Sequence, residues 1–349
     1  MNEFDRINNV LNHDPVDRPP VICPMHTATV ALMKAANAFY PEVQDDPIKM
    51  ARLARAAHEI AGFENARVPF DETVEVTAYG IITGRKGLTR HPLVLQHLIA
   101  KQEDVDRLHV PDPRTEGKVP VVLEAVRLLD EERRDVPIFL GIISPLMLAM
   151  QLRGDHETMM DMTTDPDLLK DLLGKTTDFI LEYAREAVEA GADQLVLDDS
   201  LSNSDFLSLD QFKTFAEPYE DRVANEMRKM DIESILHVCG KVDEVQLDRM
   251  IEIDVDAISI DEAVPITMAK RVGARRHVVV LGNISPTKTL LMGKADQIEE
   301  ATKRCIDDGV DAVAPGCNLE TYTPIENLIA MTSTAKSYGV KKGVKGGKR

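Results

Sequence analysis

The chain has 349 residues, of which 44% are hydrophobic, and a formal net charge of −18 at pH 7. This apolar content can fill a sizeable core, which excludes a disordered chain, and the acidic balance argues against nonspecific nucleic-acid binding, which needs a basic footprint. Four cysteines without a C-x-x-C pair argue against a disulfide framework, and no apolar run approaches the ~20 residues of a membrane span. We expect a globular cytoplasmic protein.

Short β-rich runs alternate with helical patterns along the chain, which is typical of parallel β/α units. We expect eight strands, near residues 20–23, 66–69, 137–141, 194–197, 234–238, 256–260, 277–281 and 311–314. Eight units in about 330 residues predict one α/β domain, a (β/α)₈ TIM barrel over residues 1–340, followed by a flexible basic tail at 341–349. A doubly wound sheet is the alternative, but no G-x-G-x-x-G motif follows a strand as a dinucleotide domain requires.

Three potential metal ligands stand at the ends of two predicted strands. His237 and Cys239 are two residues apart, so they point the same way if the extended chain continues through Cys239. Cys317 follows the last strand after a Pro-Gly turn. Three protein ligands with a fourth position open are typical of catalytic zinc. The alternative is a core histidine with buried apolar cysteines, which is our expectation for Cys305 in an amphipathic helical run.

Carboxylates also follow several predicted strands, where the catalytic groups of a barrel lie. Asp198 is the most interesting because it ends an apolar strand directly. Asp261 and Glu262 follow the sixth strand, and either could reach a metal as a temporary fourth ligand. Strand ends carry polar loops in any barrel, so solvation or helix capping is the alternative for each of these side chains.

Several motifs resemble a known family. Residues 237–240 (HVCG), 281–286 (LGNISP), 314–317 (APGC) and 323–327 (TPIEN) are similar to the methylcobamide:coenzyme M methyltransferases, within the uroporphyrinogen decarboxylase superfamily. Weaker similarity at 67–70, 119–125 and 189–193 extends the likeness over nearly the whole chain. The resemblance implies a TIM barrel, a role in methanogenesis, a methylated corrinoid as methyl donor, and Zn²⁺ bound by His237, Cys239 and Cys317.

The ligand charges suggest how such a site would work. Two thiolates cancel the zinc charge and a neutral imidazole adds none, so a small thiol bound there loses its proton but stays nucleophilic. Its attack on the methyl group of a Co(III) corrinoid would give a thioether and Co(I), with a carboxylate at most carrying away the thiol proton. No D-x-H-x-x-G signature of a cobalamin module occurs in the chain, so we expect the corrinoid on a partner protein.

The acceptor is the least constrained part of this prediction. Coenzyme M carries a sulfonate, for which Arg67 at a strand end is a candidate, unless it forms a structural ion pair; Asn283 is a second candidate for cofactor binding. Homocysteine or a tetrahydropterin is an alternative methyl acceptor.

A uroporphyrinogen-decarboxylase-like activity is disfavoured because residues 22–28 lack the arginine that would bind substrate carboxylates. A nonenzymatic metal-storage or corrinoid-partner module is a further alternative, which an activity assay distinguishes.

Overall fold

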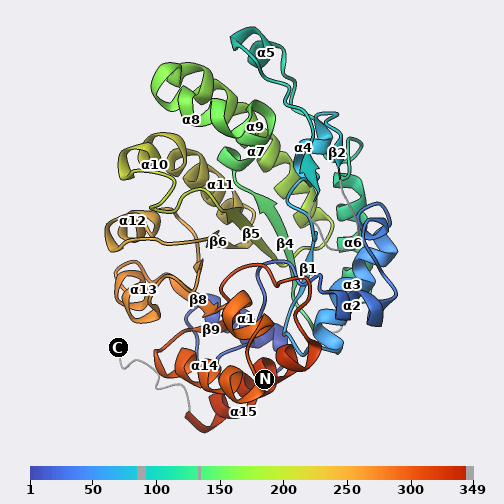
Figure 1. Ribbon diagram of the computed structural model, residues 1–349, viewed down its shortest axis with the longest axis vertical. Helices are drawn as coiled ribbons and strands as arrows, with labels where there is room; N and C mark the ends of the chain where they lie inside the picture. The colour runs from blue at the N-terminus through green and yellow to red at the C-terminus, as the bar shows by residue number, and fades with distance from the viewer. Residues whose placement is uncertain (85–91, 133–134, 343–349) are drawn as a thin grey trace.

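The computed structural model describes residues 1–84, 92–132 and 135–342 (Figure 1). Its main sheet is entirely parallel, and each strand pairs with the next along the chain. The seven strands of this sheet are β1 (Ala66–Val68), β4 (Ile138–Ile143), β5 (Gln194–Asp199), β6 (Glu233–Val238), β7 (Ala257–Ile260), β8 (Val279–Ile284) and β9 (Ala312–Pro315). The predicted barrel fold is confirmed.

The sheet closes through the segment around Val21. Val21 forms a parallel bridge to Val313 of β9, and its carbonyl oxygen accepts a hydrogen bond of 2.8 Å from the backbone N–H of Glu64, just before β1. The strand expected at 20–23 is therefore reduced to one bridge. The reason is tertiary, because side chains distant in the sequence take its backbone donors: Val21 N–H donates to the Glu64 carboxylate and Cys23 N–H to the Asn65 amide oxygen, at 2.8 and 2.9 Å.

Helices cover the outside of the barrel (Figure 1). The longest, α9 (Pro166–Glu189), starts where the Asp165 side chain accepts a hydrogen bond from Leu168 N–H, with proline in its first turn. The remaining α-helices are α1 (Glu3–Leu11), α2 (Val30–Ala36), α3 (Pro47–Glu59), α4 (Val74–Ala78), α5 (Gln102–Arg107), α6 (Val119–Glu131), α7 (Pro145–Arg153), α8 (Asp155–Thr164), α10 (Leu209–Phe215), α11 (Glu217–Lys229), α12 (Glu244–Met250), α13 (Ile266–Gly273), α14 (Ala295–Asp307) and α15 (Ile325–Lys342). A 3₁₀ helix, η1 (Glu42–Gln44), and a π-helix, η2 (Pro286–Leu291), complete the set.

The barrel has an apolar interior that is sealed at one end. Inward-facing side chains of the strands, such as Phe139, Val196 and Ile235, form one buried cluster with Ile7 and Leu11 of α1. Helix α1 therefore plugs the amino end of the barrel. The carboxyl ends of the strands form the opposite end, where polar side chains gather.

Some element boundaries differ from the sequence-based expectation. Asp198 and Asn283, expected just after strands, belong to β5 and β8, because the backbone ladder continues past the apolar run. A two-stranded hairpin, β2 (Thr83–Gly84) with β3 (Leu93–Val94), was not predicted. Helix α15 ends at Lys342 and so includes the first two residues of the expected tail. The rest of that tail, 343–349, lies outside the described residues.

Candidate metal centre

Three neighbouring strands place a row of polar side chains at the carboxyl end of the barrel. Asp198 of β5 is the register partner of His237 in β6, and His237 is the partner of Ser259 in β7. Register partners in a parallel sheet point to the same face. All three residues are buried. The row therefore lines the inner face at the end where barrel enzymes hold their catalytic groups.

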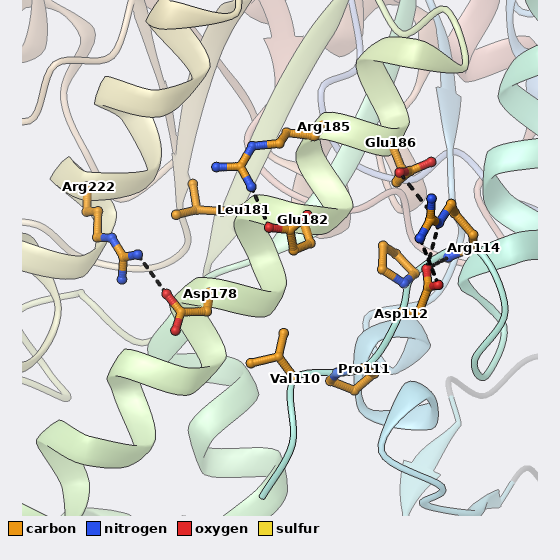
Figure 2. A pocket seen from close by; sticks show the side chains of 11 residues that line it. Val110, Pro111, Asp112, Arg114, Asp178, Leu181, Glu182, Arg185, Glu186 and Arg222 are labelled. Carbon is orange, nitrogen blue, oxygen red and sulfur yellow. Dashed lines mark hydrogen bonds and ion pairs between the residues drawn. The ribbon is translucent and has the colours of Figure 1, made fainter.

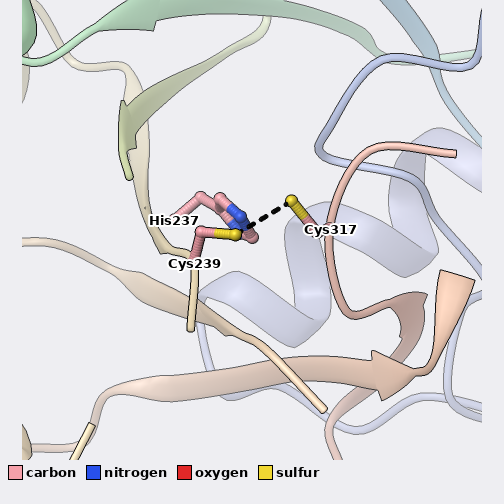
Figure 3. Close-up of side chains that lie close together, drawn as sticks. All are labelled: His237, Cys239 and Cys317. Carbon is pink, nitrogen blue, oxygen red and sulfur yellow. Dashed lines mark hydrogen bonds between the residues drawn. The ribbon is translucent and has the colours of Figure 1, made fainter. Parts of the chain in front are cut away.

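The three predicted metal ligands converge beside this row (Figure 3). Cys239 directly follows β6, and Cys317 lies in the loop after β9. Within the part of the chain that the structure describes, His237, Cys239 and Cys317 are the one group of three such side chains whose donor atoms all lie within 4.8 Å of one another. The two sulfurs are 3.3 Å apart, and both cysteines are free.

The imidazole of His237 is oriented for metal binding. Its Nδ1 lies 3.0 Å from the hydroxyl oxygen of Ser259, which fixes the ring. Its Nε2 is buried and has no hydrogen-bond partner among the described residues, although buried polar atoms are nearly always paired. One nitrogen and two sulfurs form a donor set that zinc prefers, and three protein ligands leave its fourth position open. The residues present therefore fit a catalytic zinc ion.

The pKa values of the two thiols are shifted in opposite directions. The pKa of Cys239 is lowered to about 6, first by the hydrogen bond from the Cys317 thiol and then by His237. The same hydrogen bond, together with burial, raises the pKa of Cys317. The pair therefore loses its first proton from Cys239. Metal binding requires the second proton to leave as well.

The three predicted carboxylates occupy different settings around these donors. Asp198 is buried, and neither of its carboxylate oxygens has a hydrogen-bond partner among the described residues. Burial raises its pKa well above the usual value, the charge of Glu72 adds to the rise, and the positive charge of Arg67 opposes it. Asp261 places Oδ2 3.7 Å from the sulfur of Cys239.

Glu262 is held beside the loop that carries Cys317. Its Oε1 accepts a hydrogen bond of 2.9 Å from the Ser285 hydroxyl. A Cβ atom at Gly316 would lie 2.8 Å from the backbone nitrogen of Glu262 and 3.3 Å from its Oε2. Glycine at this position therefore lets the chain pass close to Glu262 immediately before Cys317.

Arg67 and Asn283 donate hydrogen bonds to the protein's own backbone. Arg67 is buried, with Nε donating to the carbonyl of Pro24 at 3.2 Å and Nη1 donating to the carbonyl of Pro69. The side-chain amide of Asn283 donates to the carbonyls of Asp261 and Val264 at 3.0 and 2.7 Å, which holds the loop after β7. Both side chains thus shape the barrel mouth, and their cofactor-binding roles stay predictions.

Sequence reasoning missed Ser259, which orients His237. Glu72, which follows β1, also supports the site, because it accepts a hydrogen bond of 2.6 Å from the amide of Asn318, the residue after Cys317. The alternation of the β7 strand puts Ser259 on the face opposite its apolar neighbours, which was the available signal. Pairing it with His237 requires the register between the strands.

A separate cleft of about 490 Å³ lies outside the barrel, between the segment 110–114 and helices α9 and α11 (Figure 2). Its charged side chains are already paired: Arg222 with Asp178 at 2.6 Å, and Arg114 with Asp112 at 2.9 Å. None of the three metal donors lines it. The cleft therefore offers no competing chemistry.

Comparison with known proteins shows a likeness over nearly the whole chain. The family model for uroporphyrinogen decarboxylase (URO-D) matches residues 2–338. The methylcobamide:CoM methyltransferase MtbA of Methanosarcina acetivorans is 33% identical over 96% of this chain and 97% of its own, and MtaA of Methanosarcina barkeri is 32% identical over 97% and 99%. A solved methyltransferase structure from Methanosarcina mazei has a TM-score of 0.92 and 32% identity, and covers 97% of this chain and 99% of that one.

The fold and the donor set define a (β/α)₈-barrel protein with a thiol-rich centre suited to zinc. The chain belongs to the uroporphyrinogen decarboxylase family. The resemblance to methylcobamide:coenzyme M methyltransferases that the motifs indicated is confirmed over nearly the full length. In the described ranges, no helix has both the length and the apolarity to cross a membrane.

Proposed function

We propose that this chain is a zinc-dependent methyltransferase that moves a methyl group from a protein-bound methylcobamide to a small thiol, coenzyme M first of all. The observation that carries the proposal is the cluster of His237, Cys239 and Cys317, with a buried imidazole nitrogen that has no other partner among the described residues. The full-length likeness to methylcobamide:CoM methyltransferases supports the same reaction.

The chain supplies the zinc ligands and the groups around them. His237 Nε2 and the sulfurs of Cys239 and Cys317 would hold the ion, and Asp261 or Glu262 would fill the fourth position while no thiol is bound. Bound zinc supplies a Lewis acid that lowers the pKa of an incoming thiol. The two cysteine thiolates keep the centre electron-rich, which preserves the nucleophilicity of the acceptor sulfur.

Asp198 is our candidate for receiving the proton of the acceptor thiol. It lies in the register position next to His237, is shielded from water, and has two carboxylate oxygens without partners among the described residues. Burial raises its pKa, which gives it more proton affinity than an exposed aspartate. The positive charge of Arg67 opposes this rise.

The acceptor's sulfonate needs a positive partner in a mouth that is rich in carboxylates. Arg67 is a buried cation in the middle of β1, and the absence of a side chain at Gly141 leaves room for its guanidinium group. Its Nε and Nη1 already donate to backbone carbonyls. We propose that its charge, more than a direct bidentate contact, attracts the sulfonate.

The methyl donor would reach the site through the loops at the carboxyl end of the barrel. Phe206 and Tyr322 are exposed aromatic side chains on two of these loops. The Phe206 loop is tied to the segment after Cys239, since Ser204 N–H donates to the Lys241 carbonyl at 2.8 Å, and the Tyr322 loop carries Cys317. A corrinoid protein that brings its cofactor to the sulfurs would contact both loops.

The test is anaerobic conversion of methylcobalamin in the presence of coenzyme M, followed by ultraviolet-visible spectroscopy. We expect zinc-loaded protein to form Co(I), and expect metal-depleted protein and the Cys317→Ala variant to fall to background. Cys305→Ala is the matched control, because Cys305 is buried away from the donor cluster and bonded to the Gly282 carbonyl. Equal rates with and without zinc would contradict the proposal.

The same assay, with other substrates, identifies the methyl acceptor and distinguishes methyl transfer from decarboxylation. Conversion with homocysteine or a tetrahydropterin in place of coenzyme M would keep methyl transfer and change the acceptor. Release of CO₂ from uroporphyrinogen, without conversion of methylcobalamin, would replace methyl transfer by the decarboxylase activity that gives the family its name.

A further inference from the structure

The distance between the two sulfurs of the metal centre is intermediate between that of two zinc ligands and that of a disulfide. Zinc–sulfur bonds of about 2.3 Å at tetrahedral angles put two sulfur ligands about 3.8 Å apart, whereas a disulfide joins them at about 2.05 Å. The sulfurs of Cys239 and Cys317 are 3.3 Å apart and unbonded. The observed separation of 3.3 Å lies between the distances of these two states.

We propose that Cys239 and Cys317 form an oxidative modification site, in which loss of the metal allows a peroxide to convert the pair into a disulfide. The same two sulfurs are then ligands in one state and bonded to each other in the other. Metal binding and oxidation thus exclude each other. This inference depends on the three-donor site and does not depend on the identity of the methyl acceptor.

The chemistry balances with hydrogen peroxide as the oxidant. One thiolate attacks a peroxide oxygen, the O–O bond breaks, and hydroxide leaves to give a sulfenic acid. The second cysteine attacks that sulfur, an S–S bond forms, the S–O bond breaks, and the oxygen departs as water. The two thiols lose two electrons and two protons in total, and peroxide is reduced to two molecules of water.

The other two cysteines are protected, which makes the modification specific. Cys23 and Cys305 are buried, and their thiols donate to the backbone carbonyls of Met25 and Gly282 at 3.2 and 2.7 Å. Burial raises the pKa of both to about 12. Because the thiolate is the form that reacts with peroxide, both should stay reduced.

The experiment treats full-length protein, zinc-loaded or stripped of metal under reducing conditions, with a small excess of hydrogen peroxide. In the metal-free protein we expect two of the four thiols to disappear, the intact mass to fall by two hydrogen atoms, and a Cys239–Cys317 cross-linked peptide to appear on digestion. The zinc-loaded protein should keep all four thiols over the same time. Reduction with dithiothreitol should restore stoichiometric zinc binding.

Variants provide the controls. Cys305→Ala should still form the cross-link, while Cys317→Ala should stop at a sulfenic acid on Cys239 that dimedone traps. The proposal is overturned if the metal-free wild-type protein gains oxygen atoms on Cys239 without cross-linking, or if zinc-loaded protein oxidises as fast as the metal-free form. The cross-link and the rate of thiol loss are both measured without methyl transfer. Failure of the disulfide proposal therefore does not decide the methyltransferase proposal, and the reverse also holds.

Discussion

The two ends of the barrel treat buried ionisable groups in opposite ways. At the amino end, the carboxylate of Glu64 is fully buried and accepts hydrogen bonds from Arg6 at 2.7 Å and Arg18 at 2.8 Å. Arg6 also pairs with Asp17 at 2.7 Å. Every charge in this cluster has a partner, and Glu64 also accepts the Val21 N–H that helps to close the barrel.

At the carboxyl end, comparable groups are buried without partners. Asp198, His237 Nε2 and one oxygen of Glu75 have no hydrogen-bond partner among the residues that the structure describes. A buried polar atom without a partner costs stability. The difference teaches that the amino end is built for stability, whereas the carboxyl end keeps binding capacity free for a metal, a proton or a substrate.

Glu64→Gln tests the amino end and should have the largest effect on stability. Removing this charge leaves two buried arginines short of a partner, which should cost about 3–5 kcal/mol of unfolding free energy. Urea denaturation measures the loss. Glu299→Gln, at an exposed pair with Lys303, should leave the midpoint nearly unchanged. Equal losses in the two variants would remove the contrast between the ends.

Glu75→Gln tests whether burial without a full set of partners costs stability at the mouth. Burial raises the pKa of Glu75 from 4.5 to about 7. The fold therefore favours its protonated form, so the stability that this group contributes is present below pH 4.5 and is lost as pH rises through about 7. Glutamine should stabilise the protein by about 3 kcal/mol well above that pH. A gain in midpoint that does not depend on pH would contradict this cause.

Asp198→Asn sharpens the comparison by separating activity from stability. We expect methyl transfer to fall about a hundredfold, because a proton acceptor is lost, while the unfolding midpoint at neutral pH stays the same or rises. Asp199→Asn is the matched control. The side chain of Asp199, next to Asp198 in the chain, accepts hydrogen bonds from the backbone N–H groups of Leu201 and Ser202, and an asparagine side chain can retain them. If both variants lose activity equally, Asp198 has no special role.

Ser259→Ala should have the smallest effect of these substitutions, and the effect should be on zinc affinity. Without the hydroxyl at Nδ1 the His237 ring loses its orientation, and zinc affinity should fall about tenfold, as measured by competition with a chromophoric chelator. Ser234→Ala removes a buried serine at the opposite end of β6, where its hydroxyl contacts Asp256 at 3.2 Å, and should leave zinc affinity unchanged. Unaltered affinity in Ser259→Ala would limit that residue to packing.

The sequence by itself determined the barrel and named the residues with metal-binding chemistry. Strand periodicity and turn residues are local, and the H-x-C spacing places two donors on one face without knowledge of the rest of the fold. The structure then brings His237, Cys239 and Cys317 together. The reduction of the first strand to a bridge at Val21 could not be read from its apolar run, because distant side chains take its N–H groups.

Only the tertiary structure decided how the surrounding residues are used. The place of Ser259 behind His237, the lack of partners at Asp198 and the backbone bonds of Arg67 and Asn283 all depend on register and packing between segments far apart in the chain. The type of a side chain fixes what it can bind. Which partner it meets, and whether one is left free for a ligand, is fixed by the neighbouring strands that packing brings beside it.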